Sequence, residues 1–204
     1  MKKLIVLFLI VSGCASVKRP IISDKKNVVN KESAKNEFII YNYEMIFPQN
    51  DSMIFHDGYI DAKFSFNYHQ LSFTIRNKSR NALRIFWNQA SIDIFDKPHK
   101  IIHAGIKYSD SVKVLPATII LPDASIDEYV IPEDNIYFSQ GYGSDPGSWD
   151  AHDLLISNVT LPKDSVLLRT LNPQQLTLHL PVASTDNKKL NYIFRFQVNI
   201  SRME

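Results

Sequence analysis

Two histidines and two carboxylates lie close together near the middle of the chain. His99 and His103 are four positions apart, and Asp93 and Asp96 precede them. On a helix this spacing would place both imidazoles on one face, where they could hold a metal ion. The surrounding pattern predicts strands and turns instead, and positions four apart on an extended strand are separated by about 13 Å. We therefore expect no metal ligand and no cofactor here.

A serine, a histidine and an aspartate that could form a hydrolase triad follow one another later in the chain. Ser148 is preceded by Gly147, and His152 and Asp153 come shortly after it. A nucleophile elbow needs Gly-x-Ser-x-Gly between a strand and a helix, and this segment has neither that spacing nor a helical continuation. Triad members meet only in space, so a hydrolase with a site in the loop 141–153 is kept as the alternative. We assign no catalytic residue and expect a protein that is not an enzyme.

Aromatic side chains are concentrated in the same region, among glycines and serines. Tyr137, Tyr142 and Trp149 form our candidate binding surface, with Phe138 beside them. Exposed aromatic rings on a loop can contact carbohydrate or protein. The other interpretation is that these rings fold onto the domain as a plug.

The single cysteine, Cys14, ends an amino-terminal export signal. Two lysines precede an apolar run of about eight residues, whereas a membrane-spanning helix needs about 20. The run ends in Val-Ser-Gly-Cys at positions 11–14, which resembles the lipobox of bacterial lipoproteins. The resemblance implies cleavage between Gly13 and Cys14, and diacylglycerol on the Cys14 sulfur.

A lipid on Cys14 would decide where the protein resides. Two or more acyl chains anchor a protein stably, at about 0.8 kcal/mol per buried CH₂. We therefore expect a membrane-anchored envelope protein. Ala15 stands where an Asp would suggest retention in the inner membrane, so the resemblance favours the outer membrane if the cell is Gram-negative. Because the lone cysteine would carry the lipid, neither cysteine catalysis nor an internal disulfide is expected.

Charge argues against a nucleic-acid partner. The 204 residues contain 23 Lys and Arg against 21 Asp and Glu, for a net charge of +2. Phosphate recognition needs a concentrated basic surface, and the lysines of this chain are scattered. The partners that we expect are the membrane, through the lipid anchor, and an envelope protein or glycan.

Alternation of apolar and polar residues dominates the rest of the chain. It predicts a hairpin from residues 60–68 and 71–76, and a second hairpin from 176–180 and 192–200. An early strand is expected at 38–47. No window has a helical stripe of useful length.

These elements predict the domain organisation. We expect a signal peptide at 1–13, the lipidated cysteine and a tether at 14–36, and a β-domain at 37–204. Short strands separated by turn signals are typical of an immunoglobulin-like antiparallel β-sandwich, with a jelly roll or a small barrel as the alternative. The domain would bind or support other envelope components. It could also serve as an accessory subunit that offers a sheet edge for strand addition.

A second resemblance covers roughly residues 71–149 and carries no activity. It is to a stretch found in uncharacterised small bacterial lipoproteins. The residues themselves predict that Trp87, on the face shared with Leu83 and Ile85, is a core residue and that His103 closes a strand. The matching residues are Asn77-x-Ser79, Leu83-x-Ile85-x-Trp87-Asn88-x-x-Ser91, Asp93, Ile102-His103-x-Gly105, Pro116 to Leu121 and Ile131-Pro132.

Overall fold

The predicted all-β class is confirmed by the computed structural model, which describes residues 37–110, 115–144, 146–159, 166, 169, 172–186 and 188–203. The described strands form a 13-stranded sheet and a separate two-stranded sheet, and every strand pair is antiparallel. They belong to one compact unit, Ala34–Glu204.

The strands of the large sheet are β1 (Glu37–Phe47), β2 (Gln49–Asn50), β3 (Ile54–His56), β4 (Ile60–Phe66), β5 (Leu71–Asn77), β6 (Leu83–Ile85), β7 (Ser91–Ile94), β8 (Lys97–His103), β9 (Thr118–Ile120), β10 (Ser125–Pro132), β13 (Asn158–Val159), β14 (Gln174–Ser184) and β15 (Lys189–Met203). The small sheet contains β11 (Ile136–Ser139) and β12 (Ser148–Ala151). Short 3₁₀ helices occupy Trp87–Gln89, Tyr108–Asp110 and Glu133–Asn135.

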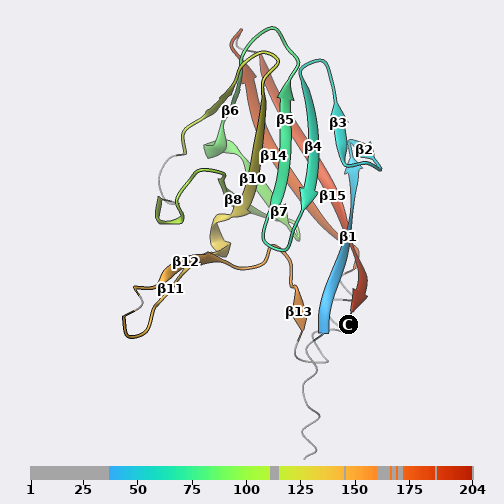
Figure 1. Ribbon diagram of the computed structural model, residues 1–204. Helices are drawn as coiled ribbons and strands as arrows, with labels where there is room; N and C mark the ends of the chain where they lie inside the picture. Colours follow the sequence, from blue (N-terminus) through green and yellow to red (C-terminus); the bar gives the residue numbers. More distant parts are fainter. Residues whose placement is uncertain are drawn as a thin grey trace, which may run out of the picture. The chain divides into compact units, whose positions relative to one another are not determined.

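The large sheet curls over itself and is nearly closed into a barrel (Figure 1). Its main path runs β13-β1-β15-β14-β7-β8-β10-β5-β4-β3. The part with β4, β5 and β10 therefore packs over the part with β7, β14 and β15. This arrangement is consistent with the predicted β-sandwich and with the small-barrel alternative, because two facing layers belong to one continuous sheet.

Both predicted hairpins are present. β4 pairs with β5 from Ile60 opposite Asn77 to Phe66 opposite Leu71, and β14 pairs with β15 from Gln174 opposite Val198 onward. In β14 every second side chain is buried, as the alternation predicted. This pattern arises because successive side chains of a strand point to opposite faces of the sheet.

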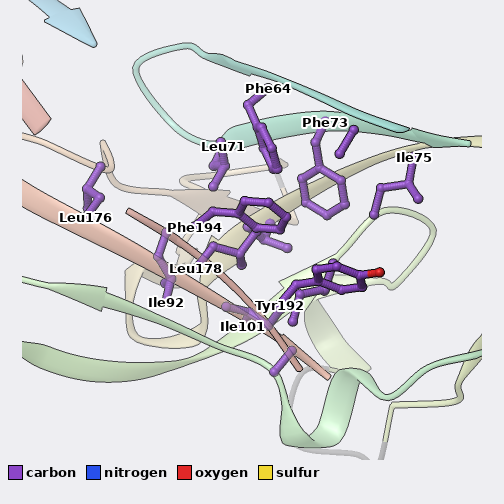
Figure 2. Close-up of a cluster of buried hydrophobic side chains, with 14 of the residues drawn as sticks. Phe64, Leu71, Phe73, Ile75, Ile92, Ile101, Leu176, Leu178, Tyr192 and Phe194 are labelled. Carbon is purple, nitrogen blue, oxygen red and sulfur yellow. The ribbon is translucent and has the colours of Figure 1, made fainter. Parts of the chain in front are cut away.

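Aromatic rings from the two facing layers meet in the core (Figure 2). Phe64 on β4 lies 4.5 Å from Phe194 and 5.3 Å from Phe196, both on β15, measured between ring centroids. Trp87, predicted to be a core residue, is 1% exposed. Complete burial of a large apolar side chain contributes about 1.5–3 kcal/mol to folding, so these rings contribute strongly to holding the two layers together.

One part of the expected loop is a strand. The composition of 141–149 predicted a loop, but the loop ends at Gly147 and β12 begins at Ser148, which lies opposite Ser139. Pairing with β11 supplies hydrogen bonds that the composition of a single segment does not reveal.

Candidate functional site

The aromatic residues selected from the sequence lie on one hairpin that projects from the domain (Figure 1). β11 and β12 pair with Tyr137 opposite Asp150 and Phe138 opposite Trp149. Tyr142 lies in the connecting turn and is 98% exposed. We call residues 136–151 the aromatic hairpin.

The turn of the aromatic hairpin depends on a glycine. Gly147 has φ +82°, and a Cβ atom there would lie 2.5 Å from the Ser139 carbonyl oxygen and 2.8 Å from Cζ of Phe138. Only glycine tolerates both the left-handed backbone and so close an approach. The conformation that displays Tyr142 therefore requires Gly147.

The hairpin has one polar face. The Tyr137 ring stacks on His152, with centroids 4.2 Å apart and an interplanar angle of 19°. The Tyr137 hydroxyl donates a hydrogen bond to Oδ2 of Asp150, at 3.4 Å. Ring, imidazole and carboxylate thus share one side of the hairpin.

The opposite face is apolar. Because side chains alternate along a strand, Phe138 and Trp149 point away from the face that carries Tyr137. Their rings meet edge to face at 5.5 Å, and each side chain is 45% exposed. Tyr137 and Trp149 therefore lie on the same element but on different faces. The exposure of both faces and of Tyr142 disagrees with the alternative interpretation, a plug folded onto the core.

The base of the hairpin is fixed to the large sheet. Asn135 Nδ2 donates to the Asp153 carbonyl oxygen at 3.0 Å, and the Leu154 N–H donates to the Tyr68 carbonyl oxygen at 2.7 Å. The Asp153 carboxylate pairs with His69 at 2.9 Å and accepts a hydrogen bond from Ser157. Hydrogen bonds and an ion pair thus fix the base of the hairpin that carries the exposed rings.

The three residues considered for a hydrolase triad take up separate contacts. Ser148 begins β12, and His152 lies four positions later, beyond the end of that strand, against Tyr137. Four strand positions correspond to about 13 Å. Asp153 is engaged with His69 and Ser157. None of the hydrogen bonds found among the described residues joins these three side chains to one another.

The two central histidines are also separate. Nδ1 of His99 lies 3.0 Å from Asp134, whereas Nδ1 of His103 lies 3.4 Å from Glu128. Within the described ranges, no three His, Cys, Asp or Glu side chains gather in a way that could hold a metal ion.

One polar cluster was not identified from the sequence. His103 ends β8, is 5% exposed, and stacks on Trp87 at 4.2 Å with an interplanar angle of 11°. Trp87 Nε1 donates to Oγ1 of Thr118 at 2.7 Å. Within the described part of the chain, the buried Nε2 of His103 has no hydrogen-bond partner. Trp87 and His103 were predicted separately, as a core residue and as the end of a strand. Their contact with each other and with Glu128 joins segments that are far apart in the sequence, so no local pattern could reveal it.

Gly13 and Cys14, the predicted cleavage and lipidation site, lie outside the described residues. Among the residues that are described, no helix is long and apolar enough to cross a membrane. Comparison of the chain with protein-family models, curated proteins and solved structures finds no match in any of the three.

Proposed function

We propose that this chain is a lipid-anchored cell-envelope protein whose β-domain contacts another envelope component through the aromatic hairpin, without catalysing a reaction. The observation that carries the proposal is a set of four exposed rings on one hairpin whose base is fixed to the large sheet: Tyr137, Phe138, Tyr142 and Trp149. Aromatic side chains give large contact areas at a low cost in conformational entropy. Their exposure is therefore typical of a contact surface.

The anchor is supported by the sequence. Cys14 is the only cysteine and ends a lipobox-like signal. Anchoring through that cysteine favours the outer membrane in a Gram-negative cell, because Ala15 follows it.

A binding role is favoured over hydrolysis by the distribution of polar groups. Nucleophilic catalysis needs a base within hydrogen-bonding distance of the nucleophile, and His152 is engaged with Tyr137 rather than Ser148. The strands at the two ends of the main path, Asn158–Val159 and Ile54–His56, have only two and three residues, so these two strands offer short edges for strand addition.

The two faces of the hairpin are compatible with different contacts. Tyr137, His152 and Asp150 combine stacked rings with a carboxylate, which suits a glycan. Phe138 and Trp149 form an apolar pair, which suits a protein or another apolar surface. Contact through Tyr142, in the turn between these faces, is common to both modes.

Two measurements test the proposal. The first is metabolic labelling with a fatty acid, in which the full chain should take up label and Cys14→Ala should not. Equal labelling of the two chains would refute the anchor.

The second measurement is photo-cross-linking in intact cells, from a cross-linker placed at Tyr142 of the full chain. The matched control carries it at Leu121, which is 62% exposed and follows β9. Asp123, two positions later, bonds to Asn77 at one end of β5, whereas the base of the hairpin is attached at Tyr68, beyond the other end. We expect cross-linked products that are specific to position 142. Equal products from both positions, or none from position 142, would refute the hairpin as the contact surface.

A further inference from the structure

We infer that the component contacted by the aromatic hairpin is the bilayer interface itself, on the membrane that holds the lipid. This inference deepens the proposed function and rests on its lipid anchor and on its hairpin contact. Four observations support it: the position of the hairpin, the length of the amino-terminal segment, the distribution of exposed apolar groups and the lack of Lys and Arg in the hairpin sequence.

The hairpin and the start of the domain lie at the same end of the large sheet (Figure 1). Shortly after β12, the chain forms β13, which pairs with the first residues of β1, with Glu37 opposite Val159. The Tyr41 hydroxyl donates to the Ile156 carbonyl oxygen at 2.7 Å. Residues 156–159, which follow the hairpin, are therefore attached to β1, the first strand after the amino-terminal segment.

The amino-terminal segment limits how far the domain can move from the lipid. About 22 residues separate Cys14 from Glu37, and their full extension spans at most roughly 80 Å. A surface confined in this way meets the membrane at an effective concentration in the millimolar range. A contact made by a few aromatic rings, too weak to hold a free protein, is then sufficient to orient a tethered one.

Exposed apolar side chains occur both on the hairpin and at the start of β1. Phe38 and Ile40 on β1 are 61% and 39% exposed, and Ile156 beside them is 51% exposed. Together with Phe138, Tyr142 and Trp149 they give this end of the domain an apolar character. Exposed apolar surface marks a site of contact with protein or membrane, and here it includes the first residues of the described domain.

The chemistry of the hairpin matches the region between lipid headgroups and acyl chains. Tyr and Trp concentrate there because the ring is apolar while the hydroxyl or indole N–H reaches water. Residues 136–151 contain no Lys or Arg, so the hairpin itself is not attracted to anionic headgroups. Insertion of the hairpin rings should therefore not require anionic lipid and should persist at high salt.

The two tryptophans of the chain allow a direct test. Trp87 is buried in the core, whereas Trp149 is on the hairpin. The full lipidated chain is inserted into phosphatidylcholine vesicles with or without bromine on the acyl chains, close to the carbonyl. Because bromine quenches only indoles that it contacts, we expect bromine-dependent loss of emission in the full chain. The loss should disappear in Trp149→Phe and decrease in Tyr142→Ser. It should be unchanged in the control Leu121→Ser.

The outcomes separate this inference from the proposed function. If a chain that carries the fatty-acid label and binds vesicles shows the same Trp149 emission with and without bromine, the hairpin does not contact the bilayer. The inference then fails. In that case, cross-links from position 142 to an envelope protein or glycan would still support the proposed function. Quenching that requires phosphatidylglycerol, or that salt abolishes, would also overturn the inference. A full chain without fatty-acid label would overturn both.

Discussion

At the scale of single residues, the two tryptophans have opposite environments. Trp87 is 1% exposed and stacked on His103, whereas Trp149 is 45% exposed. Replacement of a buried Trp by Ala typically costs about 3–5 kcal/mol, because apolar contact is lost and a cavity remains. We expect Trp87→Ala to lower the free energy of unfolding, measured by urea denaturation, by this amount. Trp149→Ala is the matched control and should change it little. Equal effects would contradict the assigned burial.

Gly147 provides a second test at the residue scale. An alanine there would combine a positive φ with a 2.5 Å approach to the Ser139 carbonyl oxygen. We expect Gly147→Ala to distort the aromatic hairpin and shift the Trp149 emission to longer wavelength. The large sheet should keep its urea midpoint, because the hairpin is a separate sheet.

Gly143 is the matched control for this substitution. It also has a positive φ, +68°, but a Cβ there meets nothing within 4 Å. Gly143→Ala should therefore disturb the Trp149 emission less than Gly147→Ala. The reverse order would contradict the geometry of the turn.

Part of the candidate site could be predicted from single residues, and part could not. A cluster of aromatic residues among glycines and serines was sufficient to select Tyr137, Tyr142 and Trp149. The division of these rings between two faces depends on the register of β11 with β12, which composition does not contain. The contact between His103 and Glu128 joins residues of β8 and β10, so it emerges only when these strands pair.

At the scale of elements, one tight turn stores strain. Ile94 pairs with Lys97, which leaves Phe95 and Asp96 as a two-residue hairpin turn with φ +52° and +59°. Such turns favour Asn-Gly, and a left-handed conformation costs most other residues about 1–2 kcal/mol. Phe95 is 43% exposed, so its replacement removes little packing.

We therefore expect Phe95→Asn to stabilise the domain by about 1 kcal/mol, which should raise Tm by roughly 2–4 °C. Thermal unfolding followed by circular dichroism measures this change. Phe95→Leu keeps the unfavourable φ and serves as the control. A lower Tm for the Asn variant would indicate that the Phe95 ring contributes packing that outweighs the strain.

Strands with one buried face could be predicted from alternation, as for β4, β5, β14 and β15. β10 was missed because its alternation is interrupted. Glu128 lies between Ile126 and Val130 on the inward-facing side of the strand, and this polar residue interrupts the alternation of apolar and polar residues. The side-chain atoms of His103 and Glu128 are 6% and 8% exposed, so pairing with an imidazole allows a carboxylate at a position that the pattern reserves for an apolar residue.

At the scale of the whole molecule, half-buried phenols predict sensitivity to alkali. Burial, assisted by the negative charge of Asp153, raises the pKa of Tyr41 to about 12, and burial also raises the pKa of Tyr43 to about 12. In an unfolded chain this pKa is about 10. The folded state thus holds these protons more tightly. The contribution of these two raised pKa values to the free energy of unfolding is fully present below about pH 10. It is lost as the pH rises from about 10 to 12.

We expect the urea midpoint to fall across that interval, and to fall less steeply in Tyr41→Phe. Tyr142→Phe is the matched control, because Tyr142 is 98% exposed, and it should leave the slope unchanged. An identical slope in the wild-type and Tyr41→Phe chains would contradict the assigned cause.

The pairing of β1 with β15 has a consequence for the timing of folding. The first described strand of the domain is hydrogen-bonded to its last strand, from Ile39 opposite Met203 to Phe47 opposite Arg195. Contacts between such distant segments form slowly, because a long loop must close first. The pairing of β1 with β15 therefore cannot form until residues 195–203 have been synthesised. Until then the nascent chain lacks the pairing that covers most of one edge of β1, so this contact must be among the last to form.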